Sequence, residues 1–131
     1  MYTQTRNDSF NIFIPSYEYQ WMHWDCYRLI KYVREEIDGI ILPSIYNDVY
    51  RHYPTEENLP KNLIINVVKK YCTQTQELDT GNIVILTINH IDNLGIIVNK
   101  NVVFMGNRTA TIQPLSRMSE YVDSIWEYQV Y

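Results

Sequence analysis

Apolar residues recur with helical spacing in the first half of the chain, and the clearest case lies between Asp25 and Gly39. One face of this segment carries residues at positions i, i+3, i+4, i+7 and i+11, namely Cys26, Leu29, Ile30, Val33 and Ile37. Asp25 is a favourable N-cap residue, and Gly39 is a favourable residue just after a last helical turn. The pattern predicts a helix that begins at Cys26 and places this cysteine at its first turn, on the side facing the core.

Two more helices are expected between this segment and the middle of the chain. Pro43 starts a new segment, and Ser44 is expected to cap a short helix that runs to about Tyr53. A third helix is expected from about Leu59 to Tyr71. The apolar residues of this third segment lie on one side of a helix, which is typical of an element that packs on a core.

From Gly81 onward the helical spacing gives way to short β-branched runs. These runs are "NIVILTI", "LGIIVN", "VVFMG", "ATIQPL" and "IWEYQVY", and "NKN" at 99–101 is expected to be the turn between the second and third. Helices followed by antiparallel strands predict an α+β fold. The 131 residues suit a single domain over 1–131 with a sizeable core.

Residues 1–24 show little periodicity and are expected to be an irregular aromatic lead-in, with one short strand over 11–14 that Pro15 ends. The whole chain has 12 tyrosines and 3 tryptophans but only 4 glycines. Tyr and Trp are enriched at protein interfaces, so these rings either fill the domain itself or form a surface for a partner. The candidates for a partner surface are the aromatic residues least explained by core patterning: Tyr2, Tyr17, Trp21, Trp24, Tyr46 and Tyr50. The alternative, that such rings belong to the core, applies above all to Trp21 and Trp24.

Charge and composition exclude several classes of partner. The formal charge of -4 and the lack of a basic cluster argue against nucleic acid. No run is apolar for the roughly 18 residues that a membrane span needs, and no signal peptide is expected, so the chain is expected to be made and kept in cytoplasm-like conditions. Two cysteines are too few for a disulfide framework, and no Cys or His pair has zinc-ligand spacing. No metal and no cofactor are expected.

Cys26 is the residue with the clearest chemical potential. A helix N-terminus lowers the pKa of a thiol, and its free N–H groups can hold the oxyanion formed by attack on an amide carbonyl. A cysteine in this position, packed against a later sheet that carries a histidine, is the plan of papain-like enzymes. The alternative is a buried cysteine that acts as a small apolar residue. A partner base decides between the two.

Four segments resemble the NlpC family of cell-wall cysteine peptidases, in the version found in tail proteins of long-tailed phages. They are "YQWMHWDCYRLIKYVREEIDGIILP", "LDTGNIVILTI", "NLGIIVNKNVVFMG" and "PLSRMSEYVDSIWEYQVY". Together they cover most of the chain from about Tyr19 onward, with Asn82 where the family usually has Asp. The resemblance implies an NlpC-type papain-like fold, in which N-terminal helices carry the nucleophile-position cysteine at a helix start and pack on a C-terminal antiparallel sheet.

The resemblance also shows where this chain departs from the family. Asn93 stands in place of the histidine base, and Met105, twelve residues later, stands in place of the third polar residue. Asn does not accept a proton near neutral pH, and Met cannot orient an imidazole. His90 is a displaced candidate base: a continuous strand puts it on the other face from Asn93, and a bulge is needed to re-aim it. His23 needs a folded-back lead-in loop, and His52 is the weakest candidate.

The resemblance, with these departures, implies a phage tail protein, at the tail tip, with a structural or assembly role and without the family's catalytic histidine. Its partners are then tail-tip or baseplate proteins, and its location is the virion, after synthesis in the host cytoplasm. One alternative is an active endopeptidase or amidase of the tail that degrades peptidoglycan with Cys26 and His90. Another is a small intracellular binding domain unrelated to phage tails.

Overall fold

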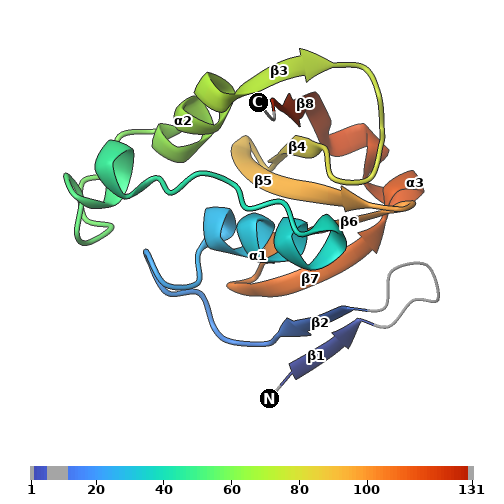
Figure 1. Ribbon diagram of the computed structural model, residues 1–131, viewed down its shortest axis with the longest axis horizontal. Helices are drawn as coiled ribbons and strands as arrows, with labels where there is room; N and C mark the ends of the chain where they lie inside the picture. The colour runs from blue at the N-terminus through green and yellow to red at the C-terminus, as the bar shows by residue number, and fades with distance from the viewer. Residues whose placement is uncertain (1, 6–11, 130–131) are drawn as a thin grey trace.

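A six-stranded antiparallel sheet is the centre of the α+β fold in the computed structural model, which describes residues 2–5 and 12–129 (Figure 1). The strand order is β3-β8-β4-β5-β6-β7. The strands are β3 (Cys72–Thr75), β4 (Ile83–Ile88), β5 (Ile91–Val98), β6 (Asn101–Gly106), β7 (Thr109–Pro114) and β8 (Val122–Tyr128). The five runs expected after Gly81 are therefore confirmed as strands. The sixth strand, β3, comes from a polar segment that the apolar pattern did not reveal.

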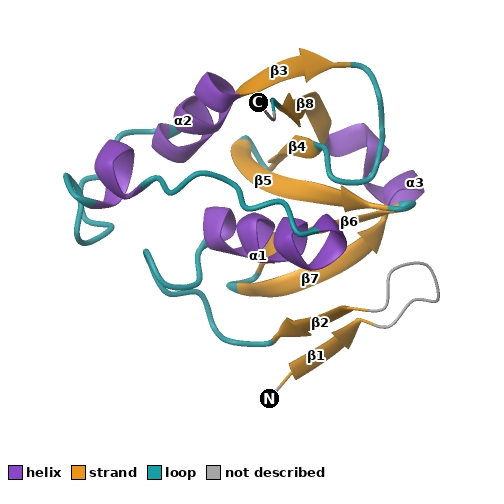
Figure 2. Cartoon of the chain, viewed as in Figure 1, coloured by secondary structure: helices purple, strands orange, loops and turns teal. Residues whose placement is uncertain are grey.

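The helices lie on both sides of this sheet (Figure 2). They are α1 (Cys26–Asp38), the π-helix η1 (Tyr46–Tyr50), α2 (Leu63–Tyr71), α3 (Leu115–Met118) and the 3-10 helix η2 (Ser119–Tyr121). The start and end expected for α1 are confirmed: the Asp25 side chain accepts a hydrogen bond from the Arg28 N–H, and Gly39 has φ of 72°. In the described residues no helix is long and apolar enough to cross a membrane.

The other two expected helices are shorter than the sequence predicted. The segment after Ser44 forms only the five-residue η1, although the Ser44 hydroxyl does accept a hydrogen bond from the Tyr46 N–H at 3.2 Å. The third helix begins at Leu63 instead of Leu59. The reason is local. Leu59 precedes Pro60, and a residue before proline avoids helical dihedrals, so the helix does not include Leu59. Asn62 has a left-handed backbone with φ of 61°, so the helix begins after it.

The lead-in is less irregular than the sequence suggested, because part of it forms a β-ribbon and, of its described residues, only 16–24 lack a strand or helix. β1 (Tyr2–Thr5) and β2 (Ile12–Pro15) form an antiparallel pair, in which Tyr2 is the Cα partner of Pro15. The strand expected over 11–14 begins at Ile12 and includes Pro15, while residue 11 lies outside the described residues. Pro15 is tolerated because it lies at the end of a two-stranded ribbon. Ile14 is fully buried, so β2 is part of the main core.

Alternate residues of the central strands face two separate hydrophobic clusters. The cluster on the α1 side includes Leu94 and Ile96 of β5, together with Leu29 and Val33 of α1. The cluster on the opposite side includes Ile97 of β5 and the buried residues of β4 and β6 that point away from α1, and Met118 of α3 packs into it. Because both faces are covered, β4 is apolar along most of its length instead of alternating.

Candidate functional site

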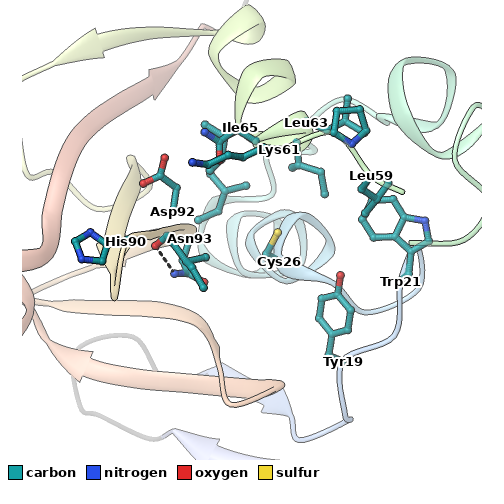
Figure 3. A pocket seen from close by; sticks show the side chains of 15 residues that line it. Tyr19, Trp21, Cys26, Leu59, Lys61, Leu63, Ile65, His90, Asp92 and Asn93 are labelled. Carbon is teal, nitrogen blue, oxygen red and sulfur yellow. Dashed lines mark hydrogen bonds between the residues drawn. The ribbon is translucent and has the colours of Figure 1, made fainter. Parts of the chain in front are cut away.

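A cavity of about 350 Å³ opens beside the first turn of α1 (Figure 3). We call it the Cys26 cavity. Three parts of the chain line it: the lead-in with the start of α1, the loop before α2 with the first turn of that helix, and the start of β5. Its lining residues are Tyr19, Trp21, Cys26, Leu59, Pro60, Lys61, Asn62, Leu63, Ile64, Ile65, His90, Ile91, Asp92, Asn93 and Leu94. The walls are therefore largely apolar, with a few polar groups, as is usual for ligand sites.

Asp25 fixes the position of the neighbouring Cys26. Its side chain is fully buried and accepts three hydrogen bonds. One oxygen accepts from the Arg28 N–H at 3.0 Å, and the other accepts from the Met22 N–H at 3.0 Å and from the Tyr50 hydroxyl at 2.6 Å. The carboxylate thus joins the lead-in, the start of α1 and η1, and it holds the first turn of α1 at the cavity.

The thiol of Cys26 is held in its neutral form. Burial, and to a smaller extent the negative charge of Asp25, raises its pKa from the ordinary value of 9.0 to about 12. The N–H groups of Tyr27 and Cys26 lower the pKa, as the sequence argument expected for a helix N-terminus, but burial and the adjacent carboxylate outweigh them. The site therefore lacks the ionised thiolate that a cysteine nucleophile requires.

Asn93 lies at the start of β5 and lines the Cys26 cavity. Its side-chain N–H donates to the backbone oxygen of Ile91 at 3.1 Å, and Figure 3 shows this bond beside the cavity. Its Cα partner in β4 is Leu86, which packs in the cluster away from α1. The next residue, Leu94, packs in the cluster on the α1 side.

His90, the candidate displaced base, lies in a turn and not in a strand. His90 lines the Cys26 cavity but is exposed, in the turn between β4 and β5, and in Figure 3 it lies on the far side of Asn93 from Cys26. Asn89 and His90 have φ of 51° and 67°, which is typical of a two-residue hairpin turn, so neither the strand nor the bulge considered for His90 is present.

Met105 does not line the Cys26 cavity. It is in β6, packs against the core on the α1 side and lines a different cavity, which it shares with Asn93. His23 and His52 are exposed and do not line the Cys26 cavity either. Cys26, Asn93 and His90 therefore line one cavity, and Met105 lies outside it.

Two of the aromatic residues expected to form a partner surface belong to the core. Trp21 is buried, its indole N–H donates to the Tyr53 backbone oxygen at 2.8 Å, and its ring meets that of buried Tyr50 edge to face at 5.2 Å. These two side chains cannot meet a partner, because the neighbouring segments already cover them. Trp24 is half-buried and packs against the core.

The remaining candidates differ in exposure. Tyr17 and Tyr46 are 52% and 51% exposed, so they are open to contact with another molecule. Tyr2 belongs to β1, but its side chain lies outside the described residues.

Tyr19 is a site residue that the sequence did not reveal. Its backbone N–H donates to the Arg108 oxygen at 2.7 Å, and the Arg108 guanidinium lies 4.8 Å from the centre of its ring. Burial raises the pKa of the Tyr19 hydroxyl, and the negative charges of Glu56 and Asp25 add to this effect. The contact joins the lead-in to the β6–β7 turn, and no periodic pattern signals such a distant pair.

Comparisons of the chain with protein-family models, curated proteins and solved structures find no match. Inference of function therefore depends on the Cys26 cavity and on the sequence resemblance.

Proposed function

We propose that this chain is a structural or assembly protein of a phage tail, built on an NlpC-type papain-like fold that has lost its hydrolytic machinery. The observation that carries the proposal is the placement of Cys26: it starts a helix packed on an antiparallel sheet, and no hydrogen bond joins its thiol to a histidine within residues 2–5 and 12–129. The first half of this observation suits a papain-like ancestry. The second half suits the loss of activity.

The chemistry of the cavity supports an inactive site. A papain-type reaction needs a thiolate made by a neighbouring base, and the same base later gives a proton to the leaving amine. With a pKa of about 12, only about one Cys26 thiol in 10⁵ is ionised at pH 7. Asn93 cannot take up the proton, because an amide is not basic near neutral pH. The cavity thus retains the position of the nucleophile without the means to activate it.

A tail location follows from the resemblance and gives the exposed aromatic residues a role. Tyr17 and Tyr46 are available to tail-tip or baseplate partners, and amphipathic rings of this kind are common anchors at interfaces. In this proposal the protein is made in the host cytoplasm and becomes part of the virion. If the protein is not part of a phage tail, the remaining alternative is a small intracellular binding domain.

An active peptidoglycan hydrolase is the second candidate, because His90 lines the same cavity as Cys26. His90 lies in a turn, so a change in that turn is what would bring its imidazole to the thiol. This candidate requires both side chains for activity. Loss of either one should then abolish digestion.

Peptidoglycan digestion separates the two candidates. Purified wild type, Cys26→Ala and His90→Ala are incubated with cell-wall sacculi, and released muropeptides are quantified by mass spectrometry. We expect equal, background release from all three. Release by the wild type that disappears in Cys26→Ala would overturn the inactive site, and its loss in His90→Ala as well would establish the hydrolase.

The tail role has its own test. The genes that flank the coding sequence are examined, and virions of a phage that carries it are purified and analysed by mass spectrometry. Tail genes on both sides and the protein in the tail fraction are expected. A coding sequence far from tail genes, or virions without the protein, would refute the assignment.

A further inference from the structure

A second concave site lies beside α1, on a side of the helix away from the Cys26 cavity. Its volume is about 210 Å³, and it shares no lining residue with the Cys26 cavity. We call it the basic cavity. Its lining residues are His23, Trp24, Arg28, Lys31, Tyr32 and Glu35. Four of them come from α1 at spacings of three and four residues, so they follow one stripe of the helix.

The charges of the basic cavity are not balanced. Arg28 and Lys31 contribute two positive charges, and Glu35 contributes one negative charge. The ion pairs in the described part of the chain are Arg34–Asp38 and Lys70–Asp48, so Arg28 and Lys31 belong to none. Burial lowers the pKa of Lys31, and the like charge of Arg28 lowers it further, while the negative charge of Glu35 offsets part of this effect. A negative group placed between them would relieve this repulsion.

Two side chains supply the charged donors of the cavity, and one of them is held in place. The Lys31 ammonium donates to the Leu42 backbone oxygen at 2.6 Å, which holds its position and leaves two of its three N–H groups for other acceptors. Arg28 is exposed, and its guanidinium offers a planar pair of N–H groups. The cations therefore present several donors, and the single carboxylate of Glu35 is the one charged acceptor.

Aromatic rings form one wall of the same cavity. Trp24 meets Tyr32 edge to face, with ring centres 5.7 Å apart, and meets Tyr17 in the same way at 6.1 Å. The indole N–H of Trp24 is buried, and no residue of the described chain accepts its hydrogen bond. A buried donor without an acceptor is costly, and such groups in native proteins usually mark a bound water or ligand.

We propose that the basic cavity binds a carboxylate of a protein partner, from an acidic side chain or from a chain terminus. A carboxylate matches the planar guanidinium of Arg28, while Lys31 lies one helical turn away to share the negative charge. The excess of one positive charge is neutralised by a carboxylate, whereas a phosphate dianion would overcompensate it and face the charge of Glu35. The neighbouring rings can pack on the aliphatic part of a peptide. This site is independent of the proposed tail function.

Nuclear magnetic resonance provides a direct test with the full chain. The three tryptophans give three indole N–H signals, and Trp24→Phe identifies the one from the cavity. The chain is titrated with N-acetyl-glutamate N-methylamide, which carries a side-chain carboxylate, and with N-acetyl-alanine, which carries a terminal one. We expect a saturable shift of the Trp24 signal with at least one of these probes and a weaker one with inorganic phosphate.

Variants decide whether the charges cause the binding. Arg28→Gln is expected to weaken binding of the effective probe at least about tenfold, and Arg28→Lys to weaken it less. Arg51→Gln removes an exposed arginine outside the cavity and should leave the affinity unchanged. If Arg28→Gln does not fold, the probe affinity of Arg28→Lys is compared with that of Arg51→Gln instead. No saturable shift, tighter binding of phosphate, or equal affinity for the Arg28 and Arg51 variants would overturn the proposal.

Discussion

Replacement of Asp25 by alanine is expected to be among the most destabilising single changes in this protein. The substitution removes the acceptor of three hydrogen bonds, from Met22, Arg28 and Tyr50. Loss of a helix N-cap costs about 1 kcal/mol. A buried Tyr50 hydroxyl without its partner costs about 1–3 kcal/mol more, and the Met22 N–H adds a smaller amount because its residue is only half-buried.

The total is therefore on the order of 2–5 kcal/mol, a large part of the roughly 5–15 kcal/mol that stabilises a typical domain. Urea unfolding followed by circular dichroism measures this loss. A double-mutant cycle with Asp25→Ala and Tyr50→Phe isolates the bond between them, and we expect a coupling of about 1–3 kcal/mol because both groups are buried.

Asp48 and Tyr71 provide a matched control for this cycle. The Tyr71 hydroxyl donates to the Asp48 carboxylate at 2.6 Å, the same distance as between Tyr50 and Asp25, but the Asp48 side chain is 26% exposed. Water can replace the lost partner there, so we expect Asp48→Ala to cost less than about 1 kcal/mol. Similar losses for the two aspartates, or no coupling between Asp25 and Tyr50, would refute the reasoning from burial.

Further predictions concern the thiols and two glycines. At pH 8, alkylation of Cys26 by iodoacetamide in a Cys72→Ala background should be roughly a thousandfold slower in the folded chain than in the urea-unfolded chain. The reason is that burial raises the pKa of the folded thiol to about 12. Equal alkylation rates, measured by mass spectrometry, would contradict this. The free energy of unfolding should fall as pH rises above about 9, because the Cys26 thiol loses its proton at a lower pH in the unfolded chain than in the folded one. Cys26→Ala should reduce this dependence on pH, which is at most about 1.4 kcal/mol per pH unit for one thiol. Identical pH dependence of wild type and variant in urea titrations would argue against a raised pKa. Gly81→Ala should cost about 1–3 kcal/mol in the same assay, because Gly81 has φ of 96° and a Cβ there would lie 2.6 Å from an Arg34 nitrogen. Gly39→Ala shares the positive φ but meets open space, so a loss as large as at Gly81 would exclude the steric cause.

Local signals in the sequence were sufficient where local chemistry determines the structure. The cap of Asp25, the stop at Gly39 and the apolar stripe between them are all properties of neighbouring residues, and α1 has the predicted start and end. The β-branched runs after Gly81 are confirmed for the same reason. β3 was not predicted, because the polar sequence of Cys72–Thr75 becomes a strand only by pairing with β8, far along the chain.

The candidate site was predictable only in part. The position of Cys26 at a helix start follows from its own segment, and the structure confirms it. The state of its thiol depends on burial, which no short pattern reports. The fates of Trp21 and Tyr50 could not be read from periodicity either, because their burial arises from contact between the lead-in and η1.

The place of β8 in the sheet determines when the sheet can be completed during synthesis of the chain. β3 and β4 follow each other in sequence, but β8 occupies the slot between them. Until Val122–Tyr128 has been synthesised, β4 keeps an open edge, and its "IVILTI" sequence carries no charge to protect that edge. A nascent chain is therefore exposed to self-association until β8 closes the gap, and truncated products that end before Val122 are expected in the insoluble fraction.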